Sequence, residues 1–359
     1  MGIMQRNFVL LDVMKTGDYF QVNDFVKEQT IANQQFDCAD DYFTLHNYDL
    51  TKYDRRFAMI HVGVDNRKYD CQEFLDTLKN RMAKLKENNF VFIYASPWES
   101  YNNLTTAHEL FFPKKTLPGY VWCGGVSWFW FYMQKKHSAF IDKIIHKNKS
   151  HDFLYLNKTY RPHRYWLYEA LKKTDLLKNS LVTFVKHPTD PCELPKAYEL
   201  PWLDINQPYP LYGMDQDVYE KPYEHTVASI VSETNDNDND VFITEKLWKV
   251  ILMKHLFVVH GNYQYLKKIQ HMGFKTFANI LDESYDNEKN RYKKIAKIID
   301  TVKQIKKYNS VDLYNKTLSI REHNFKHFYN KNALSKVIND EILLWLKFFD
   351  SSQISSAKS

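Results

Sequence analysis

The sequence is poor in cysteine and glycine. Its 359 residues include four widely spaced cysteines with no Cys-x-x-Cys pair: Cys38, Cys71, Cys123 and Cys192. This spacing excludes a cysteine-based zinc knuckle, and unpaired thiols are typical of a reducing compartment. There are nine glycines, and the adjacent pair Gly124 and Gly125 does not by itself make a phosphate-binding loop.

Long hydrophobic runs are also missing. No stretch reaches the roughly 18 apolar residues of a membrane-spanning helix. The apolar run at residues 8–13 is short, and its pattern indicates a first strand rather than a signal peptide. We therefore expect no membrane span, no signal peptide and a cytoplasmic location.

The sequence lacks a block of basic residues. The net charge is +6 and the sequence pI is ≈ 8.8, but no basic stripe of the kind that follows a nucleic-acid groove is present. We expect no nucleic-acid partner, and the mild positive excess suits a phosphate-bearing ligand. With 44% hydrophobic and 26% charged residues, the chain has a globular composition and is long enough for two domains with separate cores.

The first half of the sequence alternates between strand and helix patterns. Residues 57–62 and 90–95 are predicted strands, and residues 72–88 form an amphipathic helix between them. This order predicts a parallel α/β sheet, whose ligands bind beyond the carboxyl ends of the strands. Glu99, beside Trp98 in the loop after the second strand, is a candidate general base. Asp65 is the rival candidate, and His108 is a third.

A second alternation begins near residue 151. Residues 153–156 form a predicted strand, and a helix is predicted over residues 162–173. This order places Lys158, Arg161 and Arg164 around the carboxyl end of the strand. A guanidinium on the first helical turn, as at Arg164, can hold a pyrophosphate through two parallel hydrogen bonds.

The segment from Val241 to Gly261 contains a further helix and strand. Thr244 is a predicted N-cap, the apolar residues after it recur at helical spacing, and residues 256–259 read as a buried parallel strand. The first turn of such a helix presents free backbone N–H groups and a positive dipole end to an anion. Lys246 adds a full charge, and Glu245 is suited to accept hydrogen bonds from ribose hydroxyls.

Later segments complete the second half. We predict a helix over residues 263–271, a strand over Phe274–Phe277, and long helices over residues 290–307 and 333–349. The predicted domains are residues 1–150, which take the acceptor, and residues 151–349, which take the nucleotide. Residues 350–359 are a predicted flexible tail.

Two segments carry a resemblance to a known family. The run Phe242–Trp248, preceded by Ser232–Thr234, resembles the donor-binding signature of α1,3-fucosyltransferases and related GT-B glycosyltransferases. The run Arg161–Leu171 is similar to the other donor segment of that family, whose phosphate-binding Arg falls on Arg164. The resemblance covers roughly residues 153–285, with no comparable match before them. It implies a GT-B fold, in which two Rossmann-like domains face each other across a cleft.

The resemblance also implies a reaction and roles for the residues. An inverting, metal-independent transferase would move a sugar from a nucleoside diphosphate sugar, with GDP-fucose or another GDP-sugar favoured, to a glycan hydroxyl, without a cofactor. Arg164 and Lys246 would stabilise the leaving diphosphate, Glu245 would orient the ribose, and Phe242 would stack on the base. The remaining donor-binding residues implied are Thr244, Glu233, Arg161 and Lys158. Glu99 would be the counterpart of the family's catalytic Glu.

Two alternatives stay open at the level of sequence. The chain could bind a nucleotide sugar or a glycan without turning it over. Alternatively, the run at residues 235–240 imitates an Asp-x-Asp metal motif, in which Asp236 and Asp238 would hold a divalent ion for a UDP-sugar. This polar run lies between Glu233 and the helix at Thr244, and we interpret it as a solvated loop.

Overall fold

The computed structural model describes two compact units of the chain. The described residues are 8–12, 30–31, 34–39, 49–53, 55–61, 72–95, 119–122, 125–138, 149–157, 160–184, 218, 220–234, 236, 241–340, 343 and 347. One unit comprises Met1–Phe131 with Leu334–Ser359, and the other comprises Tyr132–Ala333. Each is described by itself below.

The first unit contains a six-stranded sheet with the order β2-β3-β1-β4-β5-β6. Its strands are β1 (Phe8–Asp12), β2 (Thr30–Ile31), β3 (Gln34–Ala39), β4 (Arg55–His61), β5 (Phe90–Ala95) and β6 (Gly119–Trp122). Only β2 pairs antiparallel among the described strands; all other pairs are parallel. The helix α3 (Gln72–Glu87) connects β4 to β5, and Met82 and Leu85 on one of its faces are buried. The predicted strand, helix and parallel strand are confirmed.

The second unit contains a four-stranded parallel sheet with the order β10-β9-β7-β8. Its strands are β7 (His151–Leu156), β8 (Leu181–Thr183), β9 (Thr226–Ser232) and β10 (Leu256–His260). Every residue of β10 is buried, as expected for a strand that is covered on both faces. The helices are α6 (Pro162–Lys173), α7 (Glu220–His225), α8 (Glu245–Leu252), α9 (Tyr265–His271), α10 (Arg291–Lys307) and α11 (Ser310–Phe328).

The strand order of this sheet reverses between β7 and β9. The chain passes from β7 to its neighbour β8 on one side, and then returns to place β9 and β10 on the other side. In doubly wound sheets, ligands bind beyond the carboxyl ends of the strands at such a reversal. Leu156 and Ser232 therefore mark the edge of the sheet where a ligand is expected.

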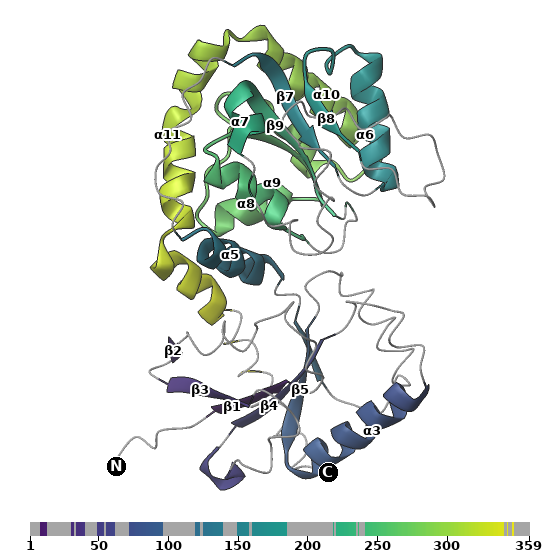
Figure 1. Cartoon of the computed structure of the whole chain (residues 1–359), viewed down its shortest axis with the longest axis vertical. Coiled ribbons are helices and arrows are strands. Elements are labelled where there is room, and N and C mark those ends of the chain that lie inside the picture. The colour runs from purple at the N-terminus through teal and green to yellow at the C-terminus, as the bar shows by residue number, and fades with distance from the viewer. Residues whose placement is uncertain are drawn as a thin grey trace. The chain divides into compact units, whose positions relative to one another are not determined.

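Helices cover both faces of the sheet (Figure 1). The helices α6 and α10 pack against each other, and α10 also contacts β10. The helix α8 packs against β9 and α11. Trp248 on α8 is fully buried and packs at a tilt against Phe274 and Phe328, so aromatic side chains fill the space between α8 and α11. The parallel sheets and their helices make an α/β fold, as predicted.

One predicted strand is wrong. Residues 274–276 have no regular secondary structure and Phe277 lies in a bend, although Phe274 and Phe277 are buried. The backbone N–H and carbonyl of Lys275 form hydrogen bonds with one side chain instead of with a neighbouring strand. Its N–H donates to Asn324 Oδ1 at 2.7 Å, and its carbonyl accepts from Asn324 Nδ2 at 2.8 Å. An asparagine of α11 thus replaces the sheet partner that the prediction required.

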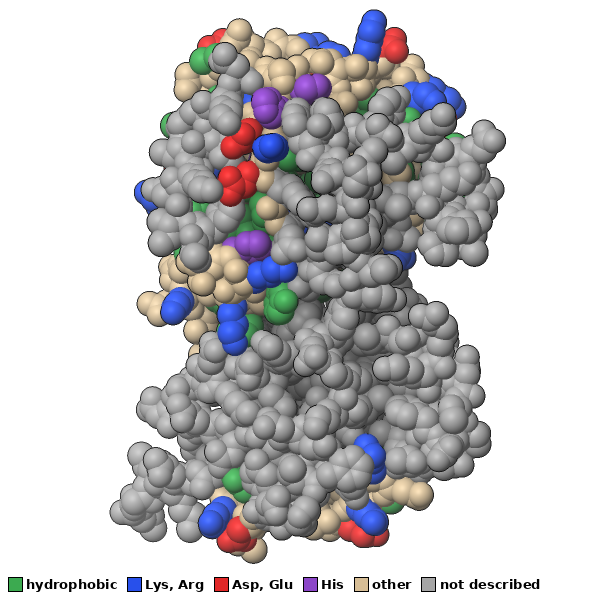
Figure 2. Space-filling view, viewed as in Figure 1, with side chains coloured by type: hydrophobic (Ala, Val, Ile, Leu, Met, Phe, Trp, Pro, Cys, Tyr) green, Lys and Arg blue, Asp and Glu red, His purple; other side chains and the backbone are tan. Residues whose placement is uncertain are grey.

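The charges on the face of the molecule drawn in Figure 2 are mixed. Acidic, basic and histidine side chains of the described residues lie close to one another there, without a continuous basic band. No helix among the described residues combines the length and the apolar character that crossing a membrane requires.

Candidate functional site

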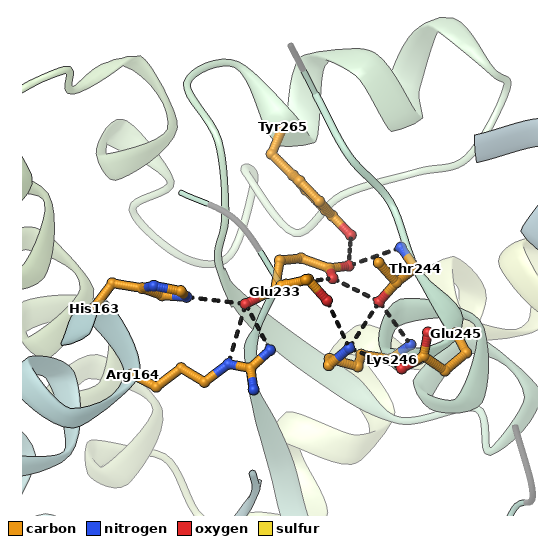
Figure 3. Close-up of polar contacts among 8 residues, drawn as sticks. His163, Arg164, Glu233, Thr244, Glu245, Lys246 and Tyr265 are labelled. Atoms are coloured by element: carbon orange, nitrogen blue, oxygen red, sulfur yellow. Dashed lines mark hydrogen bonds and ion pairs between the residues drawn. The ribbon is translucent and has the colours of Figure 1, made fainter. Parts of the chain in front are cut away.

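The candidate site lies at the carboxyl edge of the four-stranded sheet, where the strand order reverses. Glu233 follows the last residue of β9, and its backbone N–H donates to the carbonyl of His260 at the end of β10. The helices α6 and α8 both begin next to this edge, and their first turns supply Arg164 and Lys246 (Figure 3). The structure therefore brings together two segments that lie about 80 positions apart in the sequence.

Glu233 is the centre of this hydrogen-bond network. Its side chain is fully buried, and its carboxylate accepts four hydrogen bonds. Oε1 accepts from Thr244 N at 3.1 Å and from the Tyr265 hydroxyl at 2.6 Å. Oε2 accepts from Thr244 Oγ1 at 2.6 Å and from Thr234 N at 3.2 Å. A carboxylate offers about four acceptor positions, so protein groups occupy all of those of Glu233.

The backbone carbonyl of Glu233 holds α6. Arg164 donates to this oxygen from Nε at 3.2 Å and from a terminal nitrogen at 3.0 Å, and His163 Nε2 lies 3.0 Å from it. Arg164 is only 3% exposed. Tyr155 on β7 adds a second connection, since its hydroxyl donates to the carbonyl of Arg164 at 3.0 Å and lies 2.9 Å from Ser232 Oγ. Both helices are therefore attached to the same strand end.

The start of α8 is built as the sequence predicts. Thr244 is the N-cap, and its hydroxyl accepts from the backbone N–H of Lys246. The Lys246 ammonium donates to Glu245 Oε1 at 2.8 Å, to Thr234 Oγ1 at 3.1 Å and to Thr244 Oγ1 at 3.2 Å. Lys246 is therefore connected to the Glu233 carboxylate through the hydroxyl of Thr244, whereas Arg164 contacts the Glu233 carbonyl directly (Figure 3).

Charge and burial set the protonation states around Glu233. Burial lowers the pKa of Arg164, and the nearby Arg161 lowers it further, but a guanidinium remains charged at neutral pH. Burial lowers the pKa of His163 to about 4, against the opposing effect of the Asp236 carboxylate, so this ring is neutral at pH 7. Burial, followed by the Glu233 carboxylate, raises the pKa of Tyr265 well above its usual value. The Tyr265 hydroxyl thus stays a donor to Glu233.

Other predicted donor-binding residues are placed less centrally. Arg161 is the N-cap of α6 with an extended backbone and an exposed side chain. Phe242 precedes α8, and its ring packs in the core. Its backbone N–H donates to Asn262 Oδ1 at 3.0 Å. Lys158 lies outside the described residues.

The candidate bases are not among the residues that the structure describes. Glu99, Asp65 and His108 all fall in the ranges left out above. The identity of the base therefore stays a prediction.

Asp236, a residue of the alternative metal motif, is engaged by a cation. Arg291 at the start of α10 donates to both of its carboxylate oxygens, at 2.6 Å from Nε and 3.0 Å from a terminal nitrogen. The carboxylate also lies 3.6 Å from His163 Nδ1. Asp238 lies outside the described residues, and the residues that are described contain no group of three or more potential metal ligands.

Sequence reasoning missed several residues at this edge. His260 ends β10, is fully buried and stands edge-on to His163 with ring centroids 5.5 Å apart. Neither ring nitrogen of His260 has a hydrogen-bond partner in the described structure, and burial lowers its pKa well below the usual value. Tyr265 and Tyr155, which donate to or lie beside groups of this edge, were not predicted as site residues either. The one feature of the sequence that could have indicated these residues is their position, because each lies within about five residues of the end of a strand where the strand order reverses.

Gly261 follows His260 and has a specific structural reason to be glycine. A Cβ at this position would lie 2.7 Å from Cδ2 of Tyr265. The absent side chain lets the Tyr265 ring approach the backbone and reach Glu233.

Among the comparisons with known proteins, similarities were found only with solved structures. No protein-family model matches the sequence. No curated protein matches it either. Similar solved structures include an α1,3-fucosyltransferase (TM-score 0.35, 12% identity, 92% of this chain and 83% of that chain covered) and an α1,3-fucosyltransferase with GDP-fucose (0.35, 12%, 92% and 90%). Another is a mutant of S. aureus TarM in complex with fondaparinux, alpha-GlcNAc-glycerol and UDP (0.31, 11%, 92% and 57%). These structures include α1,3-fucosyltransferases, the family that the two motifs resemble.

Proposed function

We propose that the chain is a glycosyltransferase that takes its sugar from a nucleoside diphosphate sugar bound at the carboxyl edge of the four-stranded sheet. The observation that carries the proposal is the anchoring of Arg164 and Lys246, from two separate helix starts, around the single residue Glu233. The resemblance of the two segments to donor-binding motifs of α1,3-fucosyltransferases supports the same assignment.

The arrangement suits the chemistry of a leaving diphosphate. As the bond to the sugar breaks, negative charge grows on the diphosphate oxygens, and fixed positive charges stabilise that state more than the ground state. Arg164 and Lys246 supply two such charges, and the first turn of α8 adds the positive end of a helix dipole. The buried Glu233 network keeps these groups oriented before the donor binds, so little reorganisation is needed.

Glu245 and Lys246 have complementary roles in the proposal. They form an ion pair at 2.8 Å. A bound diphosphate competes for the Lys246 ammonium and frees the Glu245 carboxylate to accept hydrogen bonds from ribose hydroxyls. Donor binding therefore replaces one ion pair with contacts to the diphosphate and to the ribose.

The finer features of the proposal rest on the resemblance. GDP-fucose or another GDP-sugar is the favoured donor, and a glycan hydroxyl is the acceptor. Glu99 is the proposed base for direct inverting displacement, with Asp65 and His108 as rivals. The reaction uses no metal in this proposal, since the cationic side chains and the helix dipole take over the role of a divalent ion.

A donor panel tests the function. The purified chain is incubated with GDP- and UDP-sugars and a mixture of glycan acceptors, with and without EDTA, and the products are read by mass spectrometry. We expect a mass increase of one sugar residue on a glycan with one class of donor, unchanged by EDTA. Binding of a nucleotide sugar by calorimetry without any product would indicate a binding module instead, and abolition of turnover by EDTA would indicate the metal-dependent alternative.

A further inference from the structure

A second concave feature lies at the opposite, amino edge of the four-stranded sheet. Its walls come from the start of β9, from the turn between α8 and β10, and from the first turns of α11. The helices α8 and α11 lie side by side there (Figure 1). The polar residues that line it are Lys149, Lys254, His255, Ser310, Tyr314, Thr317 and Arg321, and the cavity volume is ≈ 20 Å³. This pocket is separate from the Glu233 network, because the strands are parallel and Glu233 lies at their other end.

Two cations of this pocket lack a carboxylate partner. Lys149 donates to the carbonyl of Tyr223 at 2.9 Å, and no carboxylate lies within 4 Å of its ammonium among the described residues. Arg321 is 6% exposed and donates to the carbonyls of Lys254 and Tyr314 at 2.9 Å and 2.6 Å and to Thr317 Oγ1 at 3.0 Å. These acceptors are neutral. Lys254 differs, because it pairs with Glu322 at 2.9 Å.

Both cations retain unused donors. An ammonium has three N–H groups, and Lys149 uses one of them; a guanidinium has five, and Arg321 uses three. Desolvation and then the charge of Arg321 lower the pKa of Lys149 to about 8, against the raising effect of Glu224. The two positive groups are thus close enough to repel each other inside a partly buried pocket. Lys149 is half-buried and Arg321 is buried, and Glu224 and Glu322 offset their charges without contacting either group. An anion bound between the two cations would relieve the remaining repulsion.

The other polar residues that line the pocket add no negative charge to it. His255 is buried, and its ring nitrogens lie 2.7 Å from Ser229 Oγ and 2.7 Å from the carbonyl of Thr226. Burial lowers its pKa to about 3, so it is a neutral wall of the pocket. The remaining lining is apolar or bears hydroxyl groups: Val227, Met253, Leu256, Leu313, Ser310, Tyr314 and Thr317.

We propose that Lys149 and Arg321 bind one monoatomic anion, of the size of chloride or bromide, in this pocket. The size follows from the volume, because ≈ 20 Å³ is little more than the space that one water molecule requires. A tetrahedral phosphate, with four oxygen atoms around phosphorus, is too large for this volume. Chloride accepts hydrogen bonds from any direction and tolerates the mixture of apolar walls and N–H donors found here. The site would stabilise the second unit without touching the nucleotide.

Thermal unfolding in bromide tests the proposal. We compare the Tm of the full chain in sodium bromide and in sodium gluconate at equal ionic strength, since gluconate is too large for the pocket. Wild type is expected to unfold at least about 2 °C higher in bromide, because a ligand that binds only the folded state stabilises it. Absence of any difference between the two salts would overturn the proposal.

Variants of Lys149 separate the site from general salt effects. Lys149→Met should lose the bromide-dependent rise in Tm while unfolding in gluconate no lower than wild type, since it removes a half-buried charge whose one direct partner is a neutral carbonyl. Lys149→Arg should keep the bromide dependence, as should the control Lys303→Met, whose side chain is exposed on α10. A Lys149→Met variant with the full bromide dependence would overturn the assignment. An anomalous bromide peak between Lys149 and Arg321 in crystals of the wild type would support it directly.

Discussion

At the scale of the residue, Glu233 has the clearest role. Its carboxylate binds the cap of α8, Thr234 and Tyr265, and its carbonyl holds Arg164 and His163. The sequence pointed to this position through the Ser232–Thr234 match, but as a group that contacts the donor. Sequence could not show the positioning role, because the partners come from four separate segments of the chain.

A conservative change at Glu233 tests this role. A glutamine has one acceptor oxygen and an NH₂ group, so in either orientation the NH₂ faces a backbone N–H, from Thr244 or from Thr234. We expect Glu233→Gln to lower the free energy of unfolding by about 1–3 kcal/mol, the cost of a buried donor left unsatisfied. Urea denaturation measures this, with Glu169→Gln on α6 as a control that should stay within about 0.5 kcal/mol of wild type. Equal stability of the two variants would contradict the role.

At the scale of the element, the start of α8 is the part of the site that local sequence determines. The N-cap Thr244 and the apolar spacing after it act within a few residues, so the helix could be predicted. The strands β4, β5, β7 and β10 could also be predicted, because short apolar runs are likewise a local property of the sequence. The absence of a strand at Phe274–Phe277 could not be predicted from sequence. Asn324, about 50 residues later, takes the hydrogen bonds that a neighbouring strand would make. His163, His260 and Tyr265 were missed because only the folded sheet places them together.

The cap itself makes a prediction. Thr244→Ala removes the hydroxyl that accepts from Lys246 N and donates to Glu233 Oε2. We expect a loss of about 1–2 kcal/mol in the free energy of unfolding, together with weaker donor binding, because Lys246 also loses an acceptor. Thr244→Ser keeps the hydroxyl and should retain most of both properties in urea denaturation and calorimetry. If the alanine and serine variants behaved alike, the hydroxyl would have no such role.

At the scale of the whole molecule, buried histidines connect stability to pH. Burial lowers the pKa of His163 to about 4, that of His255 to about 3 and that of His260 well below its usual value. Between pH 4 and pH 6.5 the unfolded chain therefore binds protons that the folded chain does not. Stability is fully present above about pH 6.5 and is lost as the pH falls, by up to about 1.4 kcal/mol per pH unit for each histidine.

Denaturation at several pH values checks this expectation. The free energy of unfolding of wild type should fall from pH 6.5 to pH 5, because three histidines act together against Glu283, whose pKa burial raises to about 7 and which has the opposite effect. His260→Phe should make that fall shallower, because it removes one of the buried groups that bind a proton on unfolding. The replacement should itself cost little stability, because the ring of His260 has no hydrogen-bond partner in the described structure. The exposed His271 provides the control variant, His271→Gln, which should follow wild type. A His260→Phe slope equal to that of wild type would contradict the contribution of this ring.

Calorimetric titration with GDP and with guanosine tests the central claim most directly, because the two ligands differ only in the diphosphate. We predict that wild type binds GDP at least about 100-fold more tightly than guanosine. Arg164→Ala and Lys246→Ala should each remove most of that difference and leave guanosine binding unchanged, whereas Lys173→Ala, an exposed lysine on α6, should keep it. Wild-type preference for GDP in both alanine variants would contradict the claim that Arg164 and Lys246 together hold a diphosphate.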